Sequence, residues 1–261
     1  MSIKVMKFGG TSIGDIRRIE HVTKIILERI KAGDKKILMV VSAMSGVTNK
    51  LVKEYVDIEN NIYNPEYDSI ISTGEQYSSA LISTFLNKNM ITSRSLLGWQ
   101  IPIHTDKSYG KARILNISSS YIKNLFKKYK VLVVSGFQGI SEDNRITTLG
   151  RGGSDTSAVA LASALNAKRC DIYTDVDGVF TTDPNIEPKA RKLDKITFEE
   201  MIEMSSAGAK VLETRSVAIA MNYDLKLQVL SSFLNKPGTF VVSEEKMEKQ
   251  KISGIAYSIN E

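Results

Sequence analysis

Short apolar runs alternate with helical patterns along most of this chain, and this alternation constrains the fold most strongly. After an apolar run at 3–6, apolar residues recur at helical spacing from Ile16 to Ile30 and stop before Gly33, a typical helix C-cap. A continuous apolar strand follows at 36–41. Strands that alternate with helices favour a parallel sheet covered on both faces. We therefore predict an α/β fold, a three-layer αβα sandwich with a mainly parallel central sheet.

The rest of the chain continues the alternation. A capping box, Thr-Phe-Glu-Glu at 197–200, opens a helix that reaches about 207. The stretch 99–120 has the weakest pattern, and we interpret it as a flap or a short hairpin. The other expected helices begin at about 47 and cover about 66–87 and 154–165, and the other expected strands cover 131–135, 171–174, 226–230 and 239–242.

Composition excludes several classes of protein. The 261 residues are 42% hydrophobic and 25% charged, which is typical of a globular protein with a full core. The net charge of +6 is spread among acidic residues, so no nucleic-acid partner is expected. No apolar run is long enough to span a membrane and no export signal is seen, so we expect no membrane partner. The single cysteine, Cys170, fits a cytoplasmic location, and His21 and His104 lack partners at metal-ligand spacing.

A lysine and two glycines follow the first apolar run. In the segment KFGGTS, Lys7 precedes Gly9 and Gly10, whose backbone N–H groups are able to approach a ligand closely. The partly positive end of the next helix is expected nearby. Such a corner suits phosphate, and the alternative is an ordinary strand-to-helix turn. Neither the Walker pattern nor the Gly-x-Gly-x-x-Gly pattern of dinucleotide-binding proteins is present.

A second glycine-rich segment, LGRGGSD, lies at 149–155. Ser154 is a suitable N-cap for the helix that follows, and Gly152 and Gly153 expose N–H groups at its positive end. Arg151 offers a fork that matches a carboxylate or a phosphate, and Asp155 adds an acid. The alternative is a capped loop that carries a surface arginine.

Acidic and hydroxyl side chains also follow the strand at 171–174. The acids of TDVDGVFTTDP, at 174–184, lie where α/β sheets bind ligands, and Phe180 is able to contact a base with its ring face. A turn rich in Asp, Gly and Pro is the alternative. Glu75 is either a helix cap or a binder of an amine. Lys210 lies near an expected helix start, where the helix dipole disfavours a cation, so it is either functional or simply solvated.

Taken together, these segments resemble those of the aspartokinases, a branch of the amino acid kinase family with a carbamate kinase-like fold. Seven motifs in order carry the resemblance and cover almost the whole chain: KFGGTS at 7–12, SAMSGVTN at 42–49, STGE at 72–75, LGRGGSDTSA at 149–158, TDVDGVFTTDP at 174–184, GAKVL at 208–212 and SSFLNKPGT at 231–239.

The resemblance implies an activity and roles for single residues. It implies transfer of the γ-phosphate of ATP to the β-carboxylate of L-aspartate, with Mg²⁺ held through the ATP phosphates rather than by a protein metal site. The product, 4-phospho-L-aspartate, would lead to lysine or diaminopimelate, threonine and methionine. Catalytic roles fall to Lys7 and Asp155. The substrate-binding set is Thr48, Glu75, Arg151, Gly152, Gly153 and Ser154, with Arg151 on the α-carboxylate and Glu75 on the ammonium. The ATP-binding set is Lys7, Phe8, Gly9, Gly10, Thr174, Asp175, Phe180, Asn185, Lys210 and Val211.

The resemblance also implies a domain plan, from which the chain departs in places. The plan has a catalytic domain at 1–242, with an aspartate-binding part at about 1–150 and a nucleotide-binding part at about 151–242. Residues 243–261 would be a linker and the start of a paired-ACT regulatory region, so we expect no lysine or threonine feedback from this chain, and a homodimer is possible. Departures from the family pattern are Phe180 for tyrosine, Asn185 for arginine, and Glu213-Thr214 for His-Pro.

Two alternatives to aspartate phosphorylation are left open by the sequence. The first keeps the kinase fold but changes the acceptor to glutamate, N-acetylglutamate or carbamate. The carboxylate of Glu75 argues against an acetylated amine, because it calls for an ammonium partner. The second is a catalytically silent protein that binds a nucleotide or a partner subunit, against which the intact Lys7, Arg151 and Asp155 argue.

Overall fold

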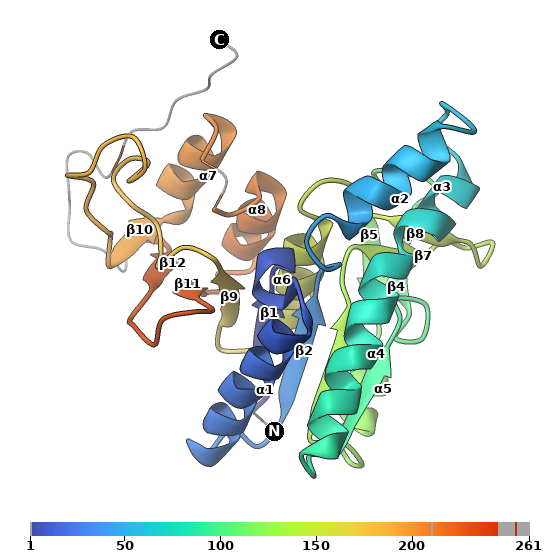
Figure 1. Ribbon diagram of the computed structural model, residues 1–261, viewed down its shortest axis with the longest axis horizontal. Helices are drawn as coiled ribbons and strands as arrows, with labels where there is room; N and C mark the ends of the chain where they lie inside the picture. Colours follow the sequence, from blue (N-terminus) through green and yellow to red (C-terminus); the bar gives the residue numbers. More distant parts are fainter. Residues whose placement is uncertain (1, 210, 245–253, 255–261) are drawn as a thin grey trace.

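One eight-stranded sheet forms the centre of the molecule, for which a computed structural model describes residues 2–209, 211–244 and 254 (Figure 1). The strand order is β10-β12-β11-β9-β1-β2-β6-β3. Neighbouring strands in this described sheet are parallel except β11 and β12, which are antiparallel. The strands are β1 (Lys4–Phe8), β2 (Ile37–Val41), β3 (Ser93–Leu96), β6 (Val131–Ser135), β9 (Cys170–Thr174), β10 (Lys195–Thr197), β11 (Leu227–Ser231) and β12 (Thr239–Val242).

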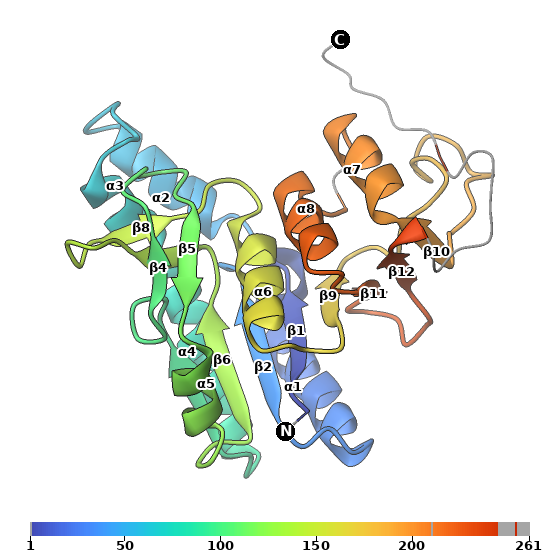
Figure 2. The same cartoon turned by 180° about the vertical axis from the view of Figure 1, so that it is seen from behind.

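Helices cover both faces of this sheet, so the predicted three-layer α/β arrangement is confirmed. Alternate residues of β1 point to opposite faces: Met6 and Phe8 lie in the core beneath α1 and α4, and Val5 lies in the core beneath α5, α6, α7 and α8 (Figures 1 and 2). The helices are α1 (Ile16–Lys31), α2 (Val47–Val56), α3 (Pro65–Ile71), α4 (Thr73–Lys88), α5 (Ser119–Leu125), α6 (Gly153–Ala164), α7 (Phe198–Ser206) and α8 (Thr214–Asn222).

Local sequence signals account for several of these elements. The carboxylate of Asp15 accepts the backbone N–H of Arg18 at 2.9 Å and caps α1, which ends before Gly33 at φ 106°. Both halves of the predicted capping box are present at the start of α7, between Thr197 and Glu200. Every residue of β2 is buried, as expected for a central parallel strand covered on both faces.

A second sheet of four short strands stands beside the carboxyl ends of the main sheet. Its order is β5-β4-β7-β8, and these strands are β4 (Ile103–Thr105), β5 (Ile114–Ile117), β7 (Gln138–Ile140) and β8 (Ile146–Thr148). The predicted hairpin in 99–120 is confirmed, because β4 pairs antiparallel with β5. The pairing of β4 with β7 and of β7 with β8 was not predicted.

Some sequence predictions are wrong in detail. The single helix expected at 66–87 is two helices, α3 and α4, with Ser72 between them. The hydroxyls of Ser72 and Thr73 donate to the carbonyls of Ser69 and Ile70, and the side-chain amide of Gln138 donates to the Ser72 carbonyl. These bonds compete with the continuous helical ladder.

The expected N-cap of α6 is also wrong. Gly152, at φ 65°, is the N-cap residue instead of Ser154, and its carbonyl accepts the N–H groups of Asp155 and Thr156. Strands β3 and β10 were not predicted, and α8 begins at Thr214, a few residues after the helix start expected near 210. The predicted linker and ACT start at 243–261 lie almost wholly outside the described residues. The division at about 150 stays a prediction, since strands from both parts form one sheet, joined where β1 pairs with β9.

Candidate active site

A cavity of about 520 Å³ opens at the carboxyl ends of β1 and β2. This is the edge at which ligands bind in α/β sheets. Among its lining residues are both predicted catalytic residues and the whole predicted substrate-binding set. The full lining is Lys7, Ser42, Ala43, Thr48, Asn49, Val52, Tyr67, Ile71, Glu75, Gly110, Phe137, Gly150, Arg151, Gly152, Gly153, Ser154 and Asp155.

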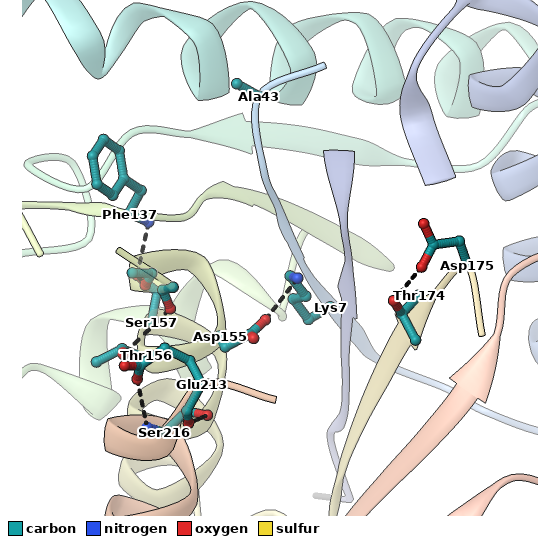
Figure 3. Close-up of polar contacts among 12 residues, drawn as sticks. Lys7, Ala43, Phe137, Asp155, Thr156, Ser157, Thr174, Asp175, Glu213 and Ser216 are labelled. Carbon is teal, nitrogen blue, oxygen red and sulfur yellow. Dashed lines mark hydrogen bonds and ion pairs between the residues drawn. The ribbon is translucent and has the colours of Figure 1, made fainter. Parts of the chain in front are cut away.

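An ion pair between Lys7 and Asp155 lies on the cavity wall. Lys7 Nζ is 2.6 Å from Asp155 Oδ1, and both side chains are nearly buried. Figure 3 shows Lys7 at the end of β1 pointing toward Asp155 in the first turn of α6. A lysine ammonium has three donors, so one carboxylate leaves it with capacity for a further anion in the cavity.

Glu75 is the most unusual charged group of the cavity. Its side chain is 3% exposed, and Oε1 accepts the backbone N–H of Ala43 at 2.9 Å. Oε2 is buried and has no hydrogen-bond partner among the described residues. Burial raises the pKa of Glu75 to about 7. A buried polar atom without a partner calls for a ligand, and a carboxylate calls for a cationic one.

Arg151 offers the complementary charge on the facing loop. It is exposed, and it makes no hydrogen bond or ion pair within the described parts of the chain. Gly150 and Gly152 flank it at φ 77° and 65°, a left-handed conformation that favours glycine. The loop therefore projects the guanidinium at the cavity mouth, where a carboxylate or phosphate is able to meet it.

The residues predicted to bind ATP are distributed differently. Of the described members of this set, only Lys7 lines the cavity. The ring of Phe8 is fully buried and stacks on Tyr173 with the centroids 4.6 Å apart, so only its backbone is available. The N–H of Gly9 donates to the Tyr173 carbonyl at 3.2 Å, and a short 3-10 helix, Gly10–Ile13, stands between this corner and α1.

The other described members of the predicted ATP-binding set also lie outside the cavity lining. Thr174 is the last residue of β9 and donates its hydroxyl to Asp175, as Figure 3 shows. Phe180 is half-buried and forms an isolated bridge with Lys192. Asn185 is exposed and bonds Asp183, Val211 packs against the core, and Lys210 lies outside the described residues.

Several cavity residues were not recognised from the sequence. Tyr67 and Ile71 come from α3, and Phe137 and Gly110 come from loops whose positions depend on the second sheet. Ser42 and Ala43 follow β2 within the SAMSGVTN motif, which is the signal that pointed to this segment. The described residues contain no group of three or more His, Cys, Asp or Glu able to hold a metal ion, and no described helix is long and apolar enough to cross a membrane.

The backbone of Gly10 lies so close to the loop at Ala43 that a side chain at this position is expected to destabilise the fold. A Cβ at Gly10 would lie 2.7 Å from the Ala43 carbonyl oxygen, whereas a Cβ at Gly9 would meet nothing nearer than 3.5 Å. We expect Gly10→Ala to reduce the free energy of unfolding by about 1–3 kcal/mol. Gly9→Ala is the matched control and should be nearly neutral, since Gly9 has φ −72°. Thermal unfolding of both variants measures this, and equal melting temperatures would contradict it.

The fold and the cavity define an α/β protein with a charged ligand site at the carboxyl ends of its parallel strands. The sequence profile of the amino acid kinase family matches residues 2–231. The chain belongs to the amino acid kinase family. It is 51% identical over 263 residues to an aspartate kinase of Pseudomonas putida, covering all of this chain and 64% of that protein.

Solved structures agree with this assignment. Aspartate kinase from Synechocystis superposes with a TM-score of 0.83 at 42% identity, covering 95% of this chain and 41% of that one. E. coli aspartokinase III, in complex with aspartate and ADP, also gives 0.83 at 29% identity, covering 95% and 66%. The predicted carbamate kinase-like fold is confirmed by carbamate kinase from Giardia lamblia, with a TM-score of 0.67 at 16% identity.

Proposed function

We propose that this chain transfers the γ-phosphate of ATP to the β-carboxylate of L-aspartate, giving 4-phospho-L-aspartate and ADP. The observation that carries the proposal is the unpartnered buried oxygen of Glu75, in one cavity with Arg151 and the Lys7–Asp155 pair. A free α-amino acid carries the two charges that these groups complement. The names of the relatives at about 50% identity, and the aspartate and ADP of the E. coli complex, support the same assignment.

Charge complementarity orients the acceptor in this proposal. The substrate ammonium binds Glu75 Oε2, and the α-carboxylate binds the fork of Arg151. The N–H groups of Gly152 and Gly153 and the hydroxyls of Thr48 and Ser154 complete the pocket; all four residues line the cavity. The β-carboxylate is then directed toward Lys7.

Positioning and charge neutralisation perform the chemical step. A β-carboxylate oxygen attacks the γ-phosphorus, the bond from phosphorus to the β–γ bridging oxygen breaks, and ADP leaves with that electron pair. Lys7 offsets the negative charge on the transferring phosphoryl group, and Asp155 holds Lys7 in place. Mg²⁺ bound through the ATP phosphates would supply further charge neutralisation, which agrees with its usual binding by substrate phosphates and few carboxylates.

The nucleotide would lie beside this cavity, at the ends of β1 and β9. Backbone groups of Phe8, Gly9 and Gly10 would face its phosphates, with Lys210 and Val211 nearby. The base and ribose would meet Thr174, Asp175, Phe180 and Asn185. Phe180 and Asn185 depart from the family pattern, so backbone contacts would contribute more to nucleotide binding at these two positions.

An acceptor panel tests the proposed activity. We expect hydroxylamine to trap an acyl phosphate when the chain, ATP and Mg²⁺ are given L-aspartate. The kcat/KM should fall about 100-fold or more with N-acetylglutamate, because its neutral amide leaves Glu75 unpaired. L-Glutamate and carbamate complete the panel, and ATP hydrolysis without acceptor is the blank. Activity with N-acetylglutamate alone, or nucleotide binding without transfer to any acceptor, would contradict the proposal.

Three wider expectations accompany this activity. The product would enter the synthesis of lysine or diaminopimelate, threonine and methionine. The single, buried Cys170 agrees with a reducing, cytoplasmic location. A homodimer stays a prediction, which light scattering of the purified chain would measure.

A further inference from the structure

Two chain segments that reach the cavity at Gly110 and Gly150 are joined by charged side chains from outside it. The first segment contains Gly110 and Ala112, and the second contains Thr148 and Leu149, directly before the loop that carries Arg151. The backbone bond from Ala112 N to the Thr148 carbonyl, 2.8 Å, links the two segments. Their relative position therefore decides where the Arg151 guanidinium lies.

Asp68, on α3, holds the N–H groups of both segments. Its carboxylate is fully buried and accepts the N–H of Gly110 at 2.9 Å, the N–H of Thr148 at 2.7 Å and the Thr148 hydroxyl at 2.5 Å. Burial raises the pKa of Asp68, and these hydrogen bonds oppose that effect. Asp68 thus fixes the side of the paired segments nearest to α3.

Arg215, on α8, holds the carbonyl groups of the same two segments. Its Nη1 donates to the Leu149 carbonyl at 3.0 Å, and its Nη2 donates to the Ala112 carbonyl at 2.9 Å. A planar fork with two donors suits two acceptors at a fixed separation, which a lysine does not match. Helix α8 lies in the part of the chain after 150, so Arg215 ties that part to the segment at 112.

The residue that opens α8 contacts the same loop at a second point. The Glu213 carboxylate caps α8 by accepting the N–H groups of Arg215 and Ser216, and Figure 3 shows Glu213 beside Ser216. A Cβ at Gly152 would lie 2.0 Å from Glu213 Cγ. The start of α8 therefore meets the Arg151 loop on both sides of that arginine, at Leu149 and at Gly152.

We propose that Arg215 is a positioning residue that holds the Arg151 loop in place for the acceptor carboxylate. This deepens the proposed function and rests on it, since the loop acts on aspartate only if aspartate is the acceptor. Arg215 does not line the cavity, and its guanidinium bonds backbone carbonyls. Its loss should therefore weaken acceptor binding and leave nucleotide binding intact.

Kinetics of three variants test this role. Arg215→Met removes both donors and keeps the apolar stem of the side chain, and we expect it to raise the KM for aspartate about tenfold or more. The KM for ATP should stay within about twofold. Arg215→Lys should recover only part of the loss. Arg94→Met is the matched control, because Arg94 lies on β3 against the Tyr129 ring, away from the cavity. An unchanged aspartate KM, or equal rises in both KM values, would overturn the proposal.

Hydrogen exchange tests the same role without catalysis. In the unliganded protein, peptides spanning 146–156 and 110–114 should exchange faster in Arg215→Met than in the wild type, and peptides of β1 and β2 should exchange alike. Unchanged protection at 146–156, or faster exchange throughout the chain, would overturn the positioning role. If no acceptor is phosphorylated by the wild type, the proposed function fails, and this measurement still decides whether Arg215 anchors the loop.

Discussion

Lys7→Ala is expected to lower kcat about a thousandfold while changing the KM for aspartate by less than about threefold. Lys7 contributes a positive charge where negative charge develops on the transferring phosphoryl group, and loss of one such group costs about 10²–10³ or more in rate. Aspartate itself is held by Glu75 and Arg151 in the proposed arrangement, so its ground-state binding should survive. An effect confined to kcat identifies an interaction made mainly in the transition state.

The stability of Lys7→Ala must be measured together with its rate. Removal of Lys7 leaves Asp155 nearly buried without its ion-pair partner, which typically destabilises a protein by about 3 kcal/mol or more. Lys4→Ala is the control, because Lys4 lies on the same strand and pairs with the buried Asp171 at 2.5 Å, although Asp171 also has Arg169 Nε at 2.6 Å. Because Asp171 retains Arg169, this variant should lose less stability than Lys7→Ala, and it should keep its kcat below the melting temperature. A Lys7→Ala enzyme with wild-type kcat and only a raised KM would contradict the proposed role.

The layers of the fold were predictable because their signals are local. Strands β2 and β6 appear as continuous apolar runs, and α1 and α7 carry caps that can be seen in the sequence. The second sheet was less predictable. Its strands are three or four residues long, which is too short for a recognisable alternation of apolar and polar residues. In addition, β4 pairs with β7 from a distant part of the chain, and this pairing leaves no local signal in the sequence.

The residues proposed to bind the acceptor were predicted from the sequence, whereas the residues that hold their loops in place were not. Thr48, Glu75, Arg151 and the residues after it lie in recognisable motifs, and the structure brings them to one cavity. Asp68 and Arg215 lie in no segment with a chemical signature, and their importance depends on backbone groups that only tertiary contacts bring near. The roles predicted for the ATP-binding residues stay predictions, because apart from Lys7 no described member of that set lines the cavity.

Glu75→Gln is expected to raise the KM for aspartate about 100-fold. The glutamine oxygen is able to keep the hydrogen bond from Ala43 N–H, so the loop after β2 should retain its position. What is lost is the negative charge opposite the substrate ammonium, and a charge-assisted bond contributes about 1.5–3 kcal/mol. Glu66→Gln is the control, because Glu66 pairs with Arg145 on the surface and lies outside the cavity. A change of less than about threefold in the aspartate KM would contradict the assigned role.

The pH dependence of aspartate use should report the same group. With a pKa of about 7 in the free enzyme, Glu75 is largely protonated at pH 6 and largely ionised at pH 8. Only the ionised form attracts the ammonium, so kcat/KM for aspartate should rise through pH 7 and then level off. In Glu75→Gln this rise of kcat/KM through pH 7 should disappear. A wild-type profile without any inflection between pH 6 and 8 would show that the carboxylate does not control acceptor binding.

The stability of the unliganded protein should change with pH in the opposite direction. The folded-state pKa of Glu75, about 7, lies above the ordinary glutamate value of 4.5, so between these pH values the folded state binds more protons than the unfolded state. The stability that Glu75 contributes is therefore fully present below pH 4.5 and is lost as pH rises through 7, by about 3 kcal/mol.

Glu75→Gln removes this loss, so the variant should be more stable than the wild type at pH 8 and similar to it at pH 5. Denaturant unfolding at both pH values measures the difference, and a variant less stable at pH 8 would mean that the ionised carboxylate has a partner in the free enzyme. The buried charge would then be a structural group, whereas the expected result makes it a group that destabilises the empty protein and is stabilised by its substrate.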